Sequence, residues 1–144
     1  MDFIESELEI YEKGQFQFRR LDSLSAVCNA PRIKSGVYVL NVISNENLGV
    51  IYIGSSGKMQ NDGNLKTRNG GLWDRLVNGK QFDRLPRRKC WPIQMERDSI
   101  EIFEVNWYVT FDDQNQHIPS FVEGILIQKY FEKYRCLPLW NKEY

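Results

Sequence analysis

The stretch SIEIFEVNWYVTF, residues 99–111, constrains the fold more than any other part of the chain. Apolar side chains recur at every second position along it: Phe103, Val105, Trp107, Val109 and Phe111. This period of two places the five side chains on one face of an extended segment, which is the pattern of a β-strand with a buried face. A strand is therefore expected here.

A β-hairpin is expected earlier in the chain. Two apolar runs, GVYVLNVI at 36–43 and VIYIG at 50–54, flank the turn-forming sequence SNENLG. Both runs are rich in the β-branched and aromatic residues that favour strands. Each run also carries a phenol, Tyr38 in the first and Tyr52 just before the second run stops in Gly-Ser-Ser-Gly. Packing alone would account for either tyrosine, because tyrosine is a good strand residue.

Two helices complete the main pattern. Residues 71–79, GLWDRLVNG, place leucines one turn apart and end in a glycine, and residues 118–134 carry Pro119 in a first helical turn. The polar stretch 55–70 is long for a loop in a compact domain, and such loops are usually functional or disordered. Residues 1–30 are ambiguous, with helical spacing near their start and the alternating sequence FQF at 16–18.

Composition narrows the class of protein. A chain of 144 residues fits one domain. Its 19 basic and 19 acidic residues give a formal net charge of zero, which argues against coating DNA by bulk charge but allows a local basic patch. Three scattered cysteines without a CxxC pair argue against structural zinc and for a reducing compartment. The acidic N-terminus resembles neither a signal peptide nor a membrane span, so a cytoplasmic protein is expected.

One carboxylate interrupts the apolar stripe of the second helix. On a helical projection Leu126, Ile127, Tyr130 and Tyr134 fall within about 60° of Glu123. A carboxylate on a buried face is costly unless it is paired or bound to a metal. Glu123 is therefore either a ligand or catalytic group, or a structural residue that pairs with an arginine or lies at the margin of the stripe.

Arg75 is a second candidate, because it lies between the two leucines of the shorter helix. A guanidinium near this inward seam could hold a phosphate through two parallel hydrogen bonds. The alternative is an arginine whose stem packs on the helix while its charged head reaches water.

Taken in order, these residues resemble the GIY-YIG nuclease superfamily. Gly36-Val37-Tyr38 matches the first motif with Val in place of Ile, and Tyr52-Ile53-Gly54 matches the second. The family's helix arginine, glutamate and closing asparagine match Arg75, Glu123 and Asn141. The resemblance extends from about residue 36 to residue 141. The loop insertion followed by GGL is similar to the restriction-endonuclease branch.

The resemblance implies a small α/β (α+β) domain with a central, mostly antiparallel three-stranded sheet flanked by helices. The strands and helices expected from periodicity occur in a compatible order. A nuclease domain would then occupy residues 31–144. Residues 1–30 would be an N-terminal extension, serving as a DNA-contacting arm or as a dimer element.

The resemblance also implies a metal-dependent DNA endonuclease. Glu123 would hold Mg²⁺ or Mn²⁺, a role that suits a single carboxylate because Mg²⁺ keeps most of its waters. Arg75 would stabilise charge in the transition state. Tyr52 or Tyr38 would act as general base, with Tyr52 slightly preferred, if metal and arginine lower the phenol pKa. Asn141 would orient a ligand or a loop.

One position departs from the family pattern. Many members carry His or Tyr four residues after the arginine, where this chain has Gly79. Another residue would have to take over that role in positioning the nucleophile. The candidates are Lys58 and Lys66 in the long loop, and Lys80 beside the glycine.

A basic cluster follows the shorter helix and consists of Arg84, Arg87, Arg88 and Lys89. Together with Arg68 and Lys66, these side chains could follow the backbone of duplex DNA, the expected partner. The alternative is a solvated loop. Two other functions stay open: a nucleic-acid-binding module of the same fold that does not cleave, and a protein-interaction domain.

Overall fold

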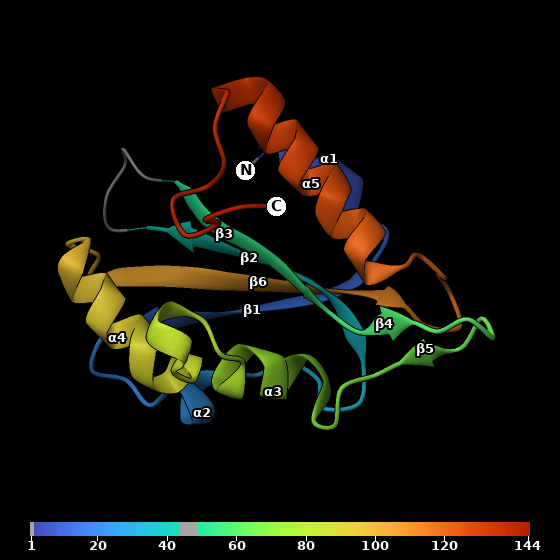
Figure 1. Ribbon diagram of the computed structural model, residues 1–144, viewed down its shortest axis with the longest axis horizontal. Coiled ribbons are helices and arrows are strands. Elements are labelled where there is room, and N and C mark those ends of the chain that lie inside the picture. Colours follow the sequence, from blue (N-terminus) through green and yellow to red (C-terminus); the bar gives the residue numbers. More distant parts are fainter. Residues whose placement is uncertain (1, 44–48) are drawn as a thin grey trace.

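The computed structural model describes residues 2–43 and 49–144, and Figure 1 shows a sheet with helices on both faces. The elements are α1 (Asp2–Leu8), β1 (Glu12–Arg19), α2 (Leu24–Val27), β2 (Ser35–Val42), β3 (Val50–Ser56), β4 (Lys58–Met59), β5 (Leu65–Lys66), α3 (Gly71–Asn78), the 3-10 helix η1 (Phe82–Arg84), α4 (Arg87–Arg97), β6 (Ile102–Phe111) and α5 (Pro119–Tyr134). Except for Gly49, the turn expected at 44–49 lies outside the described residues.

The main sheet has the strand order β1-β6-β2-β3, and every neighbouring pair is antiparallel. Strands β2, β3 and β6 confirm the three that the sequence predicts. The sheet has four strands rather than three, because β1 joins it at the edge beside β6. The alternation in β1 is weak because most of its side chains are exposed, and only Phe16 and Phe18 are buried.

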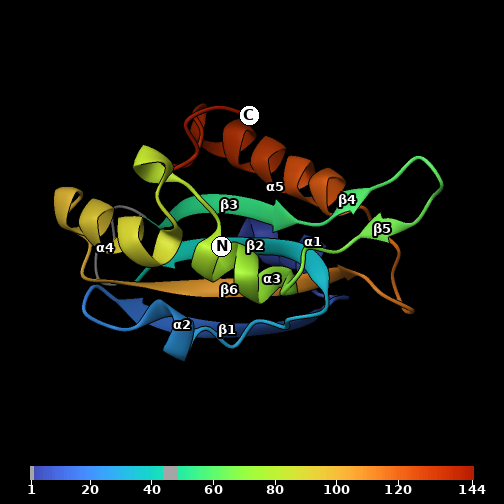
Figure 2. The same cartoon turned by 60° about the horizontal axis from the view of Figure 1, so that its bottom comes forward.

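Strand β6 lies in the interior of the sheet and is buried on both faces. Phe103 and Val105 belong to one hydrophobic core, with α3 and α4, while Tyr108 belongs to the opposite core, with α1 and α5. Figure 2 shows the same arrangement, with α5 above the sheet and α3 and α4 on its other side. The fold is therefore an α+β sandwich in which the sheet separates two cores.

The N-terminal 30 residues take part in both cores. Ile4 and Leu8 of α1 are fully buried in the core shared with α5, and Phe18 of β1 is fully buried in the other. This helix and strand agree with the spacing noted in the sequence. A contact of residues 1–30 with DNA or with a second copy stays a prediction.

The basic segment after η1 is a helix and not a loop. Helix α4 spans Arg87–Arg97 and contains Pro92. In the sequence this proline and Pro86 flank a short basic segment, and the pattern indicates no helix because proline usually marks a helix end. Arg87 is fully buried on the inner face of the helix, next to Cys90 and Trp91. The long loop 55–70 likewise holds structure of its own, the two-stranded hairpin β4–β5.

The free edge of β3 is covered by the segment that follows α5. The side chain of Asn141 accepts a hydrogen bond from the backbone N–H of Ile53 at 3.0 Å and donates one to its carbonyl at 2.9 Å. The backbone N–H of Trp140 donates to the carbonyl of Ile51 at 2.8 Å. The Asn141 amide thus imitates a neighbouring strand and fixes β3 between Tyr52 and Gly54.

This clamp makes Asn141 a stability determinant. Asn141→Ala removes two hydrogen bonds to the edge strand, and we expect the free energy of unfolding in urea to fall by about 1–3 kcal/mol. Asn61→Ala, at an exposed position in the β4–β5 hairpin, is the matched control. A loss no larger than that of the control would show that water replaces both hydrogen bonds at no cost.

Candidate functional site

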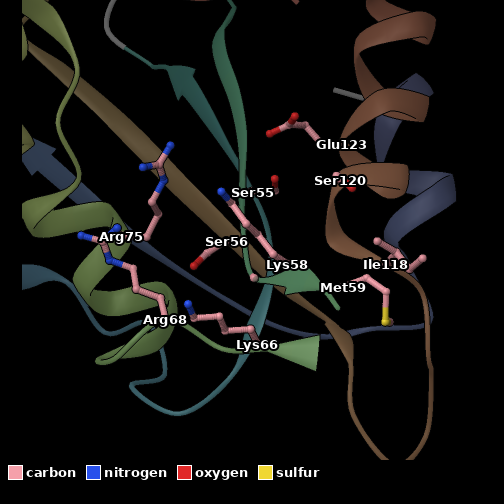
Figure 3. A pocket seen from close by; sticks show the side chains of 11 residues that line it. Ser55, Ser56, Lys58, Met59, Lys66, Arg68, Arg75, Ile118, Ser120 and Glu123 are labelled. Carbon is pink, nitrogen blue, oxygen red and sulfur yellow. The ribbon is translucent and has the colours of Figure 1, made fainter. Parts of the chain in front are cut away.

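A cavity of about 950 Å³ opens beside the end of β3. It is lined by Ser55, Ser56, Gly57, Lys58, Met59, Lys66, Arg68, Arg75, Ile118, Ser120 and Glu123. Figure 3 shows Arg75, Arg68 and Lys66 on one side of the β3 ribbon and Glu123 on the other. The cavity therefore joins the two helical layers across the edge of the sheet, with α3 supplying the arginine and α5 the carboxylate.

The charges of the lining are unbalanced. Four cationic side chains face a single carboxylate, although the whole chain has no net charge. Lys58 and Lys66 are direct cross-strand partners in β4–β5, an arrangement of like charges that destabilises a strand pair. Arg68 is the partial exception, because its Nε lies 2.7 Å from Asp74. The cavity is thus suited to an anion.

Glu123 is half-buried on the wall formed by α5. Burial raises the pKa of its carboxyl group above the ordinary value. Hydrogen bonds from Ser55 and Tyr144 and the charges of Arg75 and Arg87 act in the opposite direction without cancelling that effect. The sequence-based expectation of a carboxylate in an unfavourable setting agrees with this environment.

Arg75 lines the cavity and also contacts the phenol of Tyr38. The nearby Tyr38 phenol raises the pKa of Arg75, while burial acts in the opposite direction. The arginine thus lies beside a buried tyrosine and lines the same cavity as Glu123.

The two hairpin tyrosines lie beneath the cavity and do not line it. Their rings are 6.1 Å apart on the α3 face of the sheet, and Tyr38 is fully buried whereas Tyr52 is partly exposed. A Cβ added to Gly54 would lie 2.5 Å from the Tyr38 hydroxyl oxygen. Gly54 thus makes room for the buried phenol of Tyr38.

The pKa of Tyr52 is raised to about 12. Burial is the largest cause and the neighbouring Tyr38 adds to it, while Arg87 and Arg75 lower the pKa. Without a bound cation the arginines therefore do not bring this phenol into the range of a neutral-pH base.

The basic cluster expected after α3 separates into two environments. Arg84, Arg88 and Lys89 are exposed, and Arg88 donates a hydrogen bond to Asn78 at 2.8 Å. Arg87 is fully buried and bonds to both tyrosines, so its charge is not part of a DNA-facing surface. The surface cluster is thus smaller than the sequence suggests.

The side chains around Glu123 offer few ligands for a metal ion. Among residues 2–43 and 49–144, no group of three or more His, Cys, Asp or Glu side chains could hold a metal ion. A lone carboxylate with a hydroxyl neighbour, Ser55, fits Mg²⁺ best, because this ion keeps several waters and is often bound by one or two carboxylates plus substrate phosphates.

Sequence reasoning missed two contacts of this site. Arg87 lies with Cys90, Trp91 and Met95 on one face of α4, which is the same periodic signal that singled out Glu123. The internal proline concealed the helix and with it the signal. The contact of Tyr144 with Glu123 left no pattern in the sequence, because it joins residues through the path of the chain after α5.

No protein-family model matches the chain, and no curated protein or solved structure is detectably similar to it. Fold and site therefore define its class: an α+β protein with a four-stranded antiparallel sheet, a small second sheet and a cationic cavity at the sheet edge. No helix in the described part of the chain is long and apolar enough to cross a membrane.

The raised pKa of Glu123 makes a prediction about stability. Between the ordinary carboxyl pKa of the unfolded chain and the raised value of the folded one, the folded state binds more protons, so stability falls as pH rises. Glu123→Gln removes the free-energy cost of ionising this buried carboxyl group. We expect its melting temperature to exceed that of the parent at pH 7, with the gain absent below about pH 4.

Glu132→Gln, at an exposed position on the same helix, should show no comparable gain. A lower melting temperature for Glu123→Gln at pH 7 would mean that the carboxylate is a net stabilising partner of Arg75.

Proposed function

We propose that the protein is a metal-dependent DNA endonuclease of the GIY-YIG type that hydrolyses phosphodiester bonds. The observation that carries the proposal is the cavity in which Arg75 and Glu123 face a common space from opposite layers of the fold. The motif residues lie close enough to interact electrostatically, since Tyr38, Arg75 and Glu123 all influence the pKa of Tyr52.

The residues divide the work of hydrolysis. Tyr52, the more exposed phenol, accepts a proton from water as a phenolate; the hydroxide attacks phosphorus, and the leaving oxygen departs with a proton from solvent. Arg75 stabilises the charge that develops on the phosphoryl oxygens, and the Tyr38 phenol lies beside Arg75. Glu123 would hold Mg²⁺ or Mn²⁺, which when bound neutralises phosphate charge and polarises the scissile bond.

Duplex DNA is the substrate class that the cations favour. Lys58 and Lys66 lie side by side at the mouth of the cavity, where successive phosphates would relieve their mutual repulsion. Arg84, Arg88 and Lys89 on η1 and α4 are further exposed cations for contact with the phosphate backbone. A homodimer stays a prediction.

Plasmid DNA tests the proposed function. We expect nicking or linearisation of supercoiled plasmid with Mg²⁺ and none with EDTA. A gel shift without cleavage would identify a non-cleaving nucleic-acid-binding module, and the absence of both would favour an interaction domain. Glu123→Ala should abolish cleavage while the protein remains folded.

Arg75→Ala should separate catalysis from binding. Loss of one transition-state donor is expected to lower kcat by about 10²–10³, whereas affinity measured in Ca²⁺ should change little because other cations carry it. Arg20→Ala, an exposed arginine in the turn after β1, is the control. Weak binding combined with normal turnover at saturation would instead make Arg75 a docking residue.

The paired lysines predict a change in salt dependence. If each contacts one phosphate, Lys58→Met and Lys66→Met should each reduce the slope of log K against log salt concentration by about 0.9. A larger loss of kcat in one variant would identify the lysine that compensates for Gly79. Lys129→Met, which breaks the ion pair between Lys129 of α5 and Glu7 of α1, should leave the slope unchanged.

A further inference from the structure

Arg87 carries a charge in the interior of the protein. Its side chain has no solvent exposure, and no carboxylate of the described residues lies within ion-pair distance of it. Burying an ion without a counter-ion is costly. A buried cation of this kind is retained most readily where it acts on a neighbouring group, so its contacts indicate its role.

Hydrogen bonds account for most of the Arg87 donors. Nε donates to Gln81 at 3.1 Å, Nη1 donates to the Tyr38 hydroxyl at 2.8 Å and to the carbonyl of Arg75 at 2.9 Å, and Nη2 donates to the Tyr52 hydroxyl at 3.1 Å. The guanidinium carbon also lies 5.2 Å and 5.3 Å from the centroids of the two tyrosine rings. One side chain thus touches both phenols of the hairpin and the helix that carries Arg75.

The direction of these bonds fixes the direction of the phenol protons. Arginine has only donors, so each hydroxyl oxygen accepts from Arg87 and must direct its own hydrogen elsewhere. Tyr38 is fully buried, so its oxygen is held by Arg87 away from solvent. Tyr52 keeps one lone pair free of Arg87 and is partly exposed.

The two phenols share this cation, and they are not independent. A negative charge on Tyr38 would disfavour a second negative charge on Tyr52, whereas Arg87 and Arg75 favour the phenolate form of Tyr52. Two like groups that share a site release one proton much more readily than two. The arrangement can therefore hold a single negative charge, opposite a cation that is already in place.

The backbone of Arg87 is hydrogen-bonded to Gly79. The backbone N–H of Arg87 donates to the Gly79 carbonyl at 2.9 Å, and a Cβ on Gly79 would lie 2.3 Å from the carbonyl oxygen of Arg75. With this backbone, residue 79 can carry no side chain. The side chain that reaches the tyrosines from this end of α3 comes from Arg87, eight positions later.

We propose that Arg87 is a positioning residue for cleavage: its guanidinium orients the hydroxyls of Tyr38 and Tyr52 and stabilises the one negative charge that the pair carries as a phenolate, before Tyr52 takes the proton of the attacking water and becomes neutral. This inference rests on the proposed nuclease function. In this proposal the buried arginine of α4 orients the two tyrosine hydroxyls, a role that no side chain at position 79 can take.

Kinetics provide the first test. In Arg87→Gln, kcat for plasmid cleavage should fall by about 10²-fold at neutral pH with KM unchanged, because the charge on the pair is no longer stabilised. The rise of kcat with pH should also shift to higher pH. Arg87→Lys, which keeps the charge but not the two-pronged geometry, should lose less and shift less. Arg97→Gln, an exposed arginine at the other end of α4, is the control.

Nuclear magnetic resonance separates this inference from the proposed function. With ¹³Cζ-labelled tyrosine, two of the seven tyrosine signals, assigned through Tyr38→Phe and Tyr52→Phe, should move in Arg87→Lys at neutral pH. The two phenylalanine variants leave Arg87 in place, so they report even where an Arg87 variant does not fold. Each should shift the side-chain ¹⁵N signals of Arg87, since each removes one acceptor.

The outcomes are distinct. Unchanged kcat at saturation with a lowered melting temperature would overturn the inference and make Arg87 purely structural. Unmoved tyrosine and arginine signals would overturn it as well. If the parent chain does not cleave DNA, the proposed function fails and the role in cleavage with it, while the shifts still decide whether Arg87 holds both hydroxyls.

Discussion

The hydrogen bonding of strand β3 is the constraint on which the site depends. On one side β3 pairs with β2, and on the other the Asn141 side chain and the Trp140 backbone occupy its free edge at Ile51 and Ile53. The strand is therefore held from both sides up to the point where it reaches Ser55 and Ser56 and the cavity begins. Because this short segment is hydrogen-bonded on both edges, it fixes the positions of Tyr52 before the cavity and of Ser55 and Ser56 at the cavity.

Buried charge is the second theme of the structure. Glu123 is half-buried with a raised carboxyl pKa, and Arg87 is fully buried without a carboxylate partner among the residues described. Natural proteins tolerate such unfavourable placements mainly where a site requires them. Arg87 of α4 and Glu123 of α5 lie on opposite sides of the sheet, and both influence the pKa of Tyr52. This common neighbour supports a single site.

Sequence patterns predicted the parts of the fold that have strong periodicity. Strand β6, the hairpin β2–β3 and helices α3 and α5 could be placed because each buries a face with period 2 or 3.6. Strand β1 could not, since an edge strand with mostly exposed side chains carries little pattern. Helix α4 could not, because Pro92 in its interior imitates a helix end. Both misses concern elements whose position is decided by tertiary packing.

The candidate site followed the same rule. Glu123 and Arg75 stood out as charges on apolar faces, and they line one cavity. The tyrosines could be singled out but not placed, because only three-dimensional packing puts Tyr38 over Gly54 and away from the cavity. Arg87 was grouped with surface cations because a run of basic residues hides which of them points inward. The sequence shows that these residues are charged, but only the structure shows that Arg87 is buried while its basic neighbours are exposed.

The paired lysines of the β4–β5 hairpin have a consequence for the free protein. Each strand has only two residues, and one of the two cross-strand pairs places Lys58 opposite Lys66. Repulsion between the two lysines weakens the pairing of these short strands. A polyanion that neutralises both lysines would strengthen this pairing. Occupancy of the cavity by an anion should therefore be visible in the hairpin: amide exchange at Gln60, whose N–H donates to the Asn64 carbonyl at 3.0 Å, should be slower with the anion bound than in dilute buffer.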